Sequence, residues 1–252
     1  MKAQLLTGLT VAAAVAGAIA TAEIANANTL TRRTVYQQTE FDRDNVPTNY
    51  FDQGYGRTDI LNSTLSIEQF RPSQGTLRSV TIEFSGDITG DGGLENRDAR
   101  SQTITANLLG DLELKLPDGT SLFDLNPTNS LTFENVSRYD GRQDFAGNSG
   151  RTFEGLTASA SGQRTFTDSS FLQQFMGNSF MNFTFSATAT SSFTGSGNLS
   201  SYVDTFARSA LMVTYEYEEL PRKIPEPATT VGLGLVAGLG LMSQKKKIWK
   251  KA

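Results

Sequence analysis

Strict alternation of apolar and polar residues is the feature that most constrains the fold of this chain. From Thr103 to Leu116 every second residue is apolar or glycine, and its neighbours are mostly polar. Similar alternation runs over 183–193 and 203–217. Side chains of a strand point to opposite faces in turn, so this pattern predicts strands with one face in a core and one in water.

Further strands follow from shorter patterns. Residues 80–84 predict a fourth strand, followed by a glycine-rich loop at 86–93, and shorter strands are predicted near 34–38, 61–70, 131–133 and 153–162. Helix is predicted only at 169–176, capped by Ser170 and ended by Gly177. Residues 32–59 predict an irregular segment. Many strands with almost no helix predict an all-β fold, an antiparallel β-sandwich of the jelly-roll kind.

Composition narrows the chemistry. The chain contains no histidine and no cysteine, which removes imidazole bases, imidazole and thiolate metal ligands, thiol nucleophiles and disulfides. Removing Lys2 and the tail lysines from the 22 basic residues leaves 16, and removing Glu23 and Glu226 from the 26 acids leaves 24. Residues 28–224 therefore carry a net charge of −8, against −4 for the whole chain, which argues against nucleic acid as a partner.

The C-terminal segment, residues 222–252, has the composition of a membrane tail. Pro225-Glu226-Pro227 precedes sixteen uncharged residues, 228–243, and five lysines follow: Lys245, Lys246, Lys247, Lys250 and Lys251. Sixteen helical residues span about 24 Å, less than the ~30 Å hydrocarbon core, so we expect a weak transmembrane helix. The lysines act as a stop signal that holds the end of the chain on the cytoplasmic side.

The order of these three parts resembles the PEP-CTERM sorting signal of Gram-negative bacteria. The resemblance implies recognition by an exosortase, a membrane processing enzyme, after transient insertion in the cytoplasmic membrane. It also implies delivery to the cell surface or extracellular matrix. The alternative is a simple tail anchor that is kept in the mature protein.

The N-terminal segment, residues 1–27, predicts a secretory signal peptide. Lys2 is followed by an apolar run and by small residues in Ala-x-Ala spacing, with cleavage preferred after Ala25-Asn26-Ala27 and Ala20-Thr21-Ala22 as the alternative. The partners implied are the Sec machinery and signal peptidase. Residues 28–221 then form one exported β-sandwich domain, and no cofactor is expected.

This domain resembles the choice-of-anchor E family of bacterial surface proteins. The resemblance runs from the stretch 70–77 to Tyr217. Its intermediate motifs are Glu95-Asn96, 105–108, Asp140-Gly141, 144–147 and 195–199. Arg97 and Arg142 depart from what we expect of the family. The family is defined by architecture, so the resemblance implies a fold and a location and no activity.

Two kinds of site are candidates in segments that ordinary turns would also explain. Asp87 and Asp91, with Glu95 and Asp98 nearby, are candidate oxygen ligands for calcium, although a hairpin turn explains Asp91-Gly92-Gly93 equally well. Carboxylates of Asp140, Asp144 and Glu154 are candidates for a glycosidase pair, and solvated loop residues are the alternative.

Three functional hypotheses remain. The favoured one is a non-catalytic surface or matrix protein. The second is a module that binds extracellular polysaccharide, for which the available aromatic residues are Tyr36, Tyr50, Tyr55, Tyr139 and Tyr202. The third is a hydrolase that uses carboxylates alone.

Overall fold

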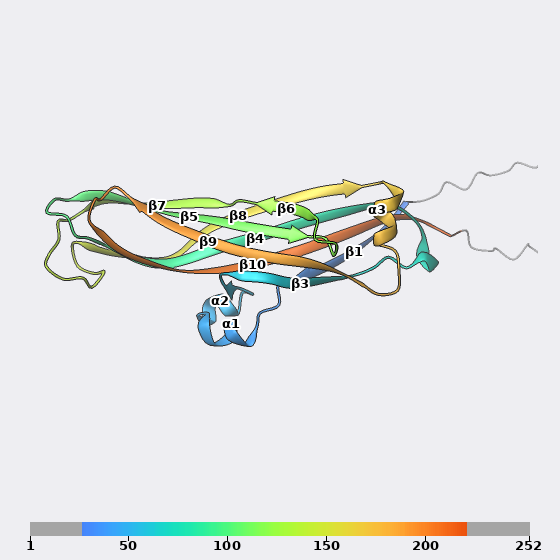
Figure 1. Cartoon of the computed structure of the whole chain (residues 1–252), viewed down its shortest axis with the longest axis horizontal. Helices are drawn as coiled ribbons and strands as arrows, with labels where there is room; N and C mark the ends of the chain where they lie inside the picture. The colour runs from blue at the N-terminus through green and yellow to red at the C-terminus, as the bar shows by residue number, and fades with distance from the viewer. Residues whose placement is uncertain (1–26, 221–252) are drawn as a thin grey trace, which may run out of the picture.

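Residues 27–220, which the computed structural model describes, form two five-stranded antiparallel sheets (Figure 1). Sheet A has the order β1 (Ala27–Val35), β10 (Leu199–Glu219), β4 (Gly75–Asn96), β8 (Gly150–Phe166), and β2 (Gly56–Arg57) also pairs with β10. Sheet B has the order β3 (Ile60–Glu68), β9 (Phe180–Thr194), β5 (Gln102–Lys115), β6 (Ser121–Leu125), and β7 (Thr128–Val136) also pairs with β5. The predicted all-β sandwich is confirmed.

The core lies between the sheets, where the alternation predicted it. In β5 the side chains of Ile104, Leu108 and Leu112 are buried, and their neighbours in sequence point outward. Sheet A supplies the opposing apolar layer, which includes Val80, Ile82, Phe84, Leu211, Val213 and Tyr215. The strands predicted at 103–116, 183–193 and 203–217 correspond to β5, β9 and β10.

The loop predicted at 86–93 is wrong, because these residues lie inside β4. Of the glycines there, Gly86 faces a side chain of the opposite sheet, whereas Gly90, Gly92 and Gly93 lie close to residues of the neighbouring strands of sheet A. A Cβ atom on Gly86 would lie 2.8 Å from Leu112 Cδ1, and one on Gly110 would lie 2.5 Å from Ile88 Cγ1. Gly86 and Gly110 therefore each accommodate a large side chain of the opposite sheet. Glycine in a strand can mark such close contact as well as a turn.

Helix is not confined to the predicted segment. Two short helices, α1 (Glu40–Asn45) and α2 (Thr48–Phe51), occupy the region predicted to be irregular, and a 3-10 turn, η1 (Pro72–Gln74), precedes β4. The predicted helix is α3 (Ser169–Gln174), and its N-cap is Asp168 rather than Ser170. Asp168 Oδ1 accepts hydrogen bonds from the backbone N–H groups of Ser170 and Phe171. A carboxylate at this position satisfies two free N–H groups at once.

The two ends of the described segment lie together. Ala27 pairs with Glu218, so β1 begins where β10 ends, near α3 (Figure 1). At about 3.3 Å per residue, the 22 residues of β4 span roughly 70 Å, so the sandwich is long and narrow. Among residues 27–220 no helix combines the length and hydrophobicity that crossing a membrane requires. The predicted sorting helix, the Pro225–Pro227 motif, the tail lysines and the signal peptide as far as Asn26 lie outside the described residues.

Candidate functional site

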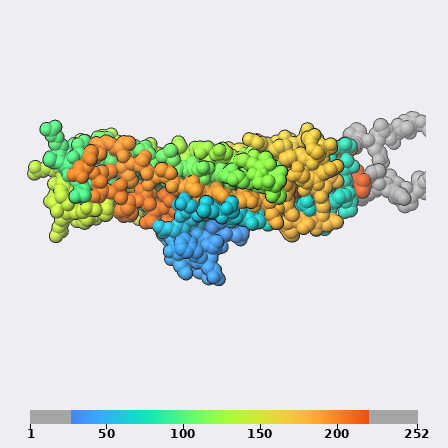
Figure 2. All heavy atoms as spheres, in the orientation of Figure 1, coloured from blue at the N-terminus to red at the C-terminus, as the bar shows by residue number. Residues whose placement is uncertain are grey.

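Three loops meet at the end of the sandwich that lies opposite Ala27 and Glu219. They are residues 97–101, 137–149 and 195–198, and together we call them the distal pole (Figures 1 and 2). Backbone hydrogen bonds join them: Tyr139 N–H donates to Asp98 O over 2.9 Å, and Arg97 N–H donates to Asn198 O over 2.9 Å. The loops therefore form one connected surface.

Asn96, at the end of β4, is the centre of this network. Its side chain is 0% exposed. Nδ2 donates to the carbonyl oxygens of Arg100 at 2.9 Å, Ser137 at 2.9 Å and Val136 at 3.2 Å. Oδ1 accepts from Asp98 N at 3.0 Å and from Ser196 Oγ at 3.3 Å. One buried amide thus bonds to all three loops, and only asparagine or glutamine offers donors and an acceptor together in this way.

Acidic side chains of the distal pole accept hydrogen bonds from the loops. Asp98 Oδ2 accepts from Gln102 Nε2, Ser196 Oγ and Gly197 N. Buried Glu95 accepts from Phe145 N at 2.9 Å through Oε2, and its Oε1 has no partner among residues 27–220. These carboxylates hold backbone and side-chain donors in place, so their first role is structural.

Five arginines lie at the distal pole or next to it: Arg97, Arg100, Arg138, Arg142 and Arg151. Within residues 27–220, none of the five forms an ion pair, whereas six of the nine other basic residues do. All except the half-buried Arg151 are exposed. The guanidinium groups of Arg100, Arg138 and Arg142 make no hydrogen bond to other described residues. The pole thus offers cationic donors to an external ligand.

One exposed tyrosine stands beside these arginines. Tyr202 is 46% exposed, and its ring meets Phe145 edge-on with 4.9 Å between ring centroids. A Cβ on Gly93 would lie 2.7 Å from Tyr202 Cε1, so the ring lies against the glycine backbone. Of the other predicted aromatic residues, Tyr36, Tyr50 and Tyr55 are buried and Tyr139 is half-buried. Tyr202 is therefore the best placed of the five to stack on a ligand.

The candidate glycosidase carboxylates lie at or near this pole. Asp140 Oδ1 accepts from Arg142 N at 2.9 Å, and Asp144 Oδ1 accepts from Ala146 N at 3.1 Å. Both bonds run to the residue two positions along, which is typical of aspartates that stabilise turns. Glu154 is exposed on β8. The proposed role of these three carboxylates in catalysis stays a prediction.

The candidate calcium ligands hold the α1–α2 segment on the outer face of sheet A. Asp87 Oδ2 accepts from Arg208 Nε at 2.7 Å, and Asp91 Oδ1 accepts from Tyr50 Oη at 2.6 Å and Gly155 N at 2.8 Å. Burial and the bond to Asp91 raise the pKa of Tyr50 to about 12. Among residues 27–220, no group of three or more carboxylates has the arrangement of a metal site.

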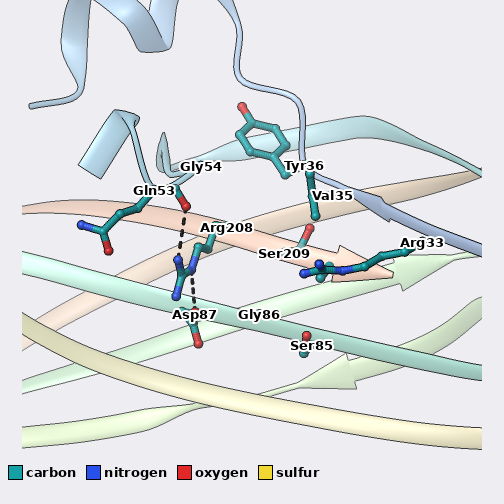
Figure 3. Close-up of a pocket in the computed structure, with 11 residues that line it drawn as sticks. Arg33, Val35, Tyr36, Gln53, Gly54, Ser85, Gly86, Asp87, Arg208 and Ser209 are labelled. Carbon is teal, nitrogen blue, oxygen red and sulfur yellow. Dashed lines mark hydrogen bonds and ion pairs between the residues drawn. The ribbon is translucent and has the colours of Figure 1, made fainter. Parts of the chain in front are cut away.

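A polar pocket of about 330 Å³ lies beside this segment (Figure 3). Arg208 points between Asp87 and the backbone oxygen of Gln53, which it contacts at 3.2 Å, and its guanidinium carbon lies 4.6 Å from the centre of the Tyr55 ring. Arg33 lies at the other side of the pocket. Arg208 is thus already bound within the protein, and the pocket serves mainly as the junction of helix and sheet.

Several residues that carry the resemblance to the choice-of-anchor E family come together at the distal pole. Glu95-Asn96, Asp140-Gly141, 144–147 and 195–199 are far apart in sequence and adjacent here, whereas 105–108 lies in β5. Sequence reasoning named these motifs but not their common location. It also missed Asn96 as the centre of the network, although an Asn at the end of a strand offers a signal of such a role.

Comparison of the sequence with protein-family models and with curated proteins gives no match. Among solved structures, the VP2 subviral particle of infectious bursal disease virus is 9% identical with a TM-score of 0.21, over 78% of this chain and 37% of that one. The structure of the Gx strain of the same virus is 11% identical with a TM-score of 0.12, over 84% and 47%. The chain spans less than half the length of either protein. TM-scores this low carry no conclusion.

Proposed function

We propose that this protein is an exported, non-catalytic component of the cell surface or extracellular matrix, sorted by its C-terminal segment. The pairing of Asn28, the first residue after the preferred cleavage site, with Tyr217 is the observation that carries the proposal. This pairing places the first and last residues of the domain at the same end of the sandwich. The loop-rich distal pole lies at the other end, roughly 70 Å away. A domain attached through residue 220 would hold that pole away from the membrane or matrix.

The non-catalytic part of the proposal is supported by the side chains available. The chain has neither histidine nor cysteine. Asp98 accepts hydrogen bonds from the neighbouring loop 195–198, and Asp140 and Asp144 accept them within their own loop. Polysaccharide turnover by the purified protein that is abolished by a single Asp or Glu substitution would contradict this part.

The sorting part is tested by fractionation and mass spectrometry of both termini. We expect processing close to Pro225–Pro227, so that the mature surface form lacks Lys250 and Lys251. Changing Pro225 and Pro227 to alanine should leave the full-length protein in the cytoplasmic membrane, because a helix can then continue through the motif. Replacing the five tail lysines with serine should disturb retention before processing instead. An intact C-terminus on surface protein would favour the simple tail anchor.

We also infer that the sandwich is a jelly roll. Sheet A carries β1, β10, β4 and β8, and sheet B carries β3, β9, β5 and β6. The chain therefore crosses between the sheets at most of its connections, as the double Greek key of a jelly roll requires. An experimentally determined structure in which β1 and β10 are not neighbours would contradict this topology.

The second candidate function is binding of extracellular polysaccharide, and the exposed ring of Tyr202 favours it. Sugar rings present C–H faces that pack on an aromatic face, and Tyr adds a polar group at the edge of that surface. A glycan array probed with the full chain in a nonionic detergent tests this function. If the protein binds no glycan on the array, polysaccharide binding is contradicted and only the proposed function as a surface protein remains.

A further inference from the structure

We propose that Arg97 and Tyr202 form a subsite for a uronic acid residue, so that the distal pole binds an acidic polysaccharide. The inference rests on the second candidate function above and gives it a ligand class and a location. Three observations support it: the relative placement of the two side chains, the absence of anionic partners for the arginines of the pole among residues 27–220, and the length of the domain.

The first observation is the placement of the two side chains. Arg97 Nη1 donates to Ser200 Oγ over 3.3 Å, which brings the guanidinium group next to β10. Ser200 and Tyr202 are two residues apart on that strand, so their side chains share a face about 7 Å apart. A pyranose ring on Tyr202 would thus bring a carboxylate at its edge within reach of Arg97. Guanidinium groups bind carboxylates through two parallel hydrogen bonds.

The second observation is the contrast in ion pairing. The arginines of the distal pole have no anionic partner among residues 27–220, while the nearby Asp98 accepts hydrogen bonds from the loop 195–198, and Asp140 and Asp144 accept them from their own loop. Arg100, Arg138 and Arg142 add guanidinium groups in the same loop as Arg97 or in the adjoining loop, which suits a polymer that repeats its negative charge. The hydrogen bonds of Asn96 to all three loops hold this surface in position before the ligand binds.

The third observation is the length of the domain, which explains how an acidic domain can bind an anionic ligand at one end. Electrostatic interactions in physiological salt decay over about 8 Å, a small fraction of the roughly 70 Å that β4 spans. Most acids of the body are therefore screened from a ligand at the pole. Nucleic acid also stacks on tyrosine and carries dense negative charge, so it is the competing ligand that the test must include.

The test is calorimetric titration of the full chain with oligogalacturonate and with its methyl-esterified form, which has the same sugars without the charge. All variants carry serine in place of the five tail lysines, because those lysines would attract any polyanion. We expect Arg97→Ala and Tyr202→Ala each to weaken binding of oligogalacturonate roughly tenfold, as loss of a charge-assisted hydrogen bond or a stacking contact does. Tyr202→Phe should retain most of the affinity.

The matched control is Arg43→Ala, because Arg43 is exposed on α1 and forms no ion pair with the described residues. It should bind oligogalacturonate as the parent does, and equal thermal midpoints should show that all variants fold. Equal affinity for the esterified ligand would overturn the role of charge and leave neutral polysaccharide binding intact. Equal loss in Arg43→Ala would overturn the location, and tighter binding of single-stranded DNA would overturn the ligand class. None of these results bears on export, which fractionation tests separately.

Discussion

Replacing Asn96 with alanine should destabilise the protein strongly, because this side chain bonds to all three loops of the distal pole. The variant loses both amide protons and one acceptor in a site that is 0% exposed. The two N–H groups of Asn96 Nδ2 can satisfy about two of the three carbonyl oxygens within reach. Each buried group that the variant leaves unpaired costs about 1–3 kcal/mol. The expected loss is therefore about 3–4 kcal/mol of unfolding free energy. With a urea m-value of about 2–3 kcal/mol/M, the midpoint should fall by about 1.5 M.

Urea titration followed by circular dichroism measures this shift. Asn107→Ala is the control, since Asn107 lies in β5 with a single side-chain hydrogen bond of 3.4 Å and should change the midpoint little. Hydrogen exchange at the amide of Tyr139 reports on the loops separately, because that amide bonds to Asp98 O. A midpoint within about 0.3 M of the control, together with unchanged protection of Tyr139, would refute the central role of Asn96.

Three further predictions follow from the packing and the titrating groups. Gly110→Ala should cost about 1–3 kcal/mol in a urea titration, because its Cβ would lie 2.5 Å from Ile88 Cγ1; full parent stability would show that the sheets can separate freely. Burial raises the pKa of Asp42, but hydrogen bonds from Thr39, Tyr36 and Arg57 outweigh it and lower the pKa from 3.8. Ionised Asp42 therefore stabilises the fold above pH 3.8 and loses this effect as the pH falls further, a dependence that Asp42→Asn should weaken in acid titrations. Since the pKa of Tyr50 rises from 10.0 to about 12, its contribution to stability should disappear between these values in alkaline titrations, and Tyr50→Phe should not show this step.

Periodicity predicted the strands well because it reports burial directly. In β5 each residue of the alternating apolar set faces sheet A, so local pattern and tertiary environment agree. Glycine misled the prediction at 86–93 because the same residue type serves a turn and a close contact inside a sandwich, either between the sheets or between neighbouring strands. Only knowledge of Leu112, which fills the space over Gly86 from another strand, could separate the two.

The helical segment and the distal pole could not be predicted for a related reason. Helix α1 is six residues long, and its capping box joins Thr39 to Asp42, a signal too short to stand out in a polar stretch. Its position depends on burial of Tyr50 and Tyr55 against Phe206, more than 150 residues away in sequence. Motifs at the pole were visible singly, but their convergence depends on strand register, which no local pattern contains.

The strand order implies a mechanical behaviour that can be tested. A ligand held at Arg97 loads the distal end of β4, whereas the C-terminal segment leaves from the opposite end of β10. These two strands pair from Asn96 with Leu199 to Gly75 with Glu219, so such a load shears the whole ladder and its bonds resist together. Asn28 and Tyr217 instead pair at one end of β1 and β10, so pulling there opens bonds one after another.

Because the chain has no cysteine, cysteine handles placed in pairs define the pulling direction without interference. Single-molecule pulling between Arg97→Cys and Leu220→Cys should require a higher unfolding force than pulling between Asn28→Cys and Leu220→Cys. The unfolding rate under load sets this force. Unfolding is slower when the pull runs from Arg97→Cys to Leu220→Cys, because all bonds between β4 and β10 then bear the load at the same time. Equal forces in the two directions would mean that β4 and β10 do not bear the load as a continuous ladder, and the sandwich would then be a poor link between a matrix ligand and the tail.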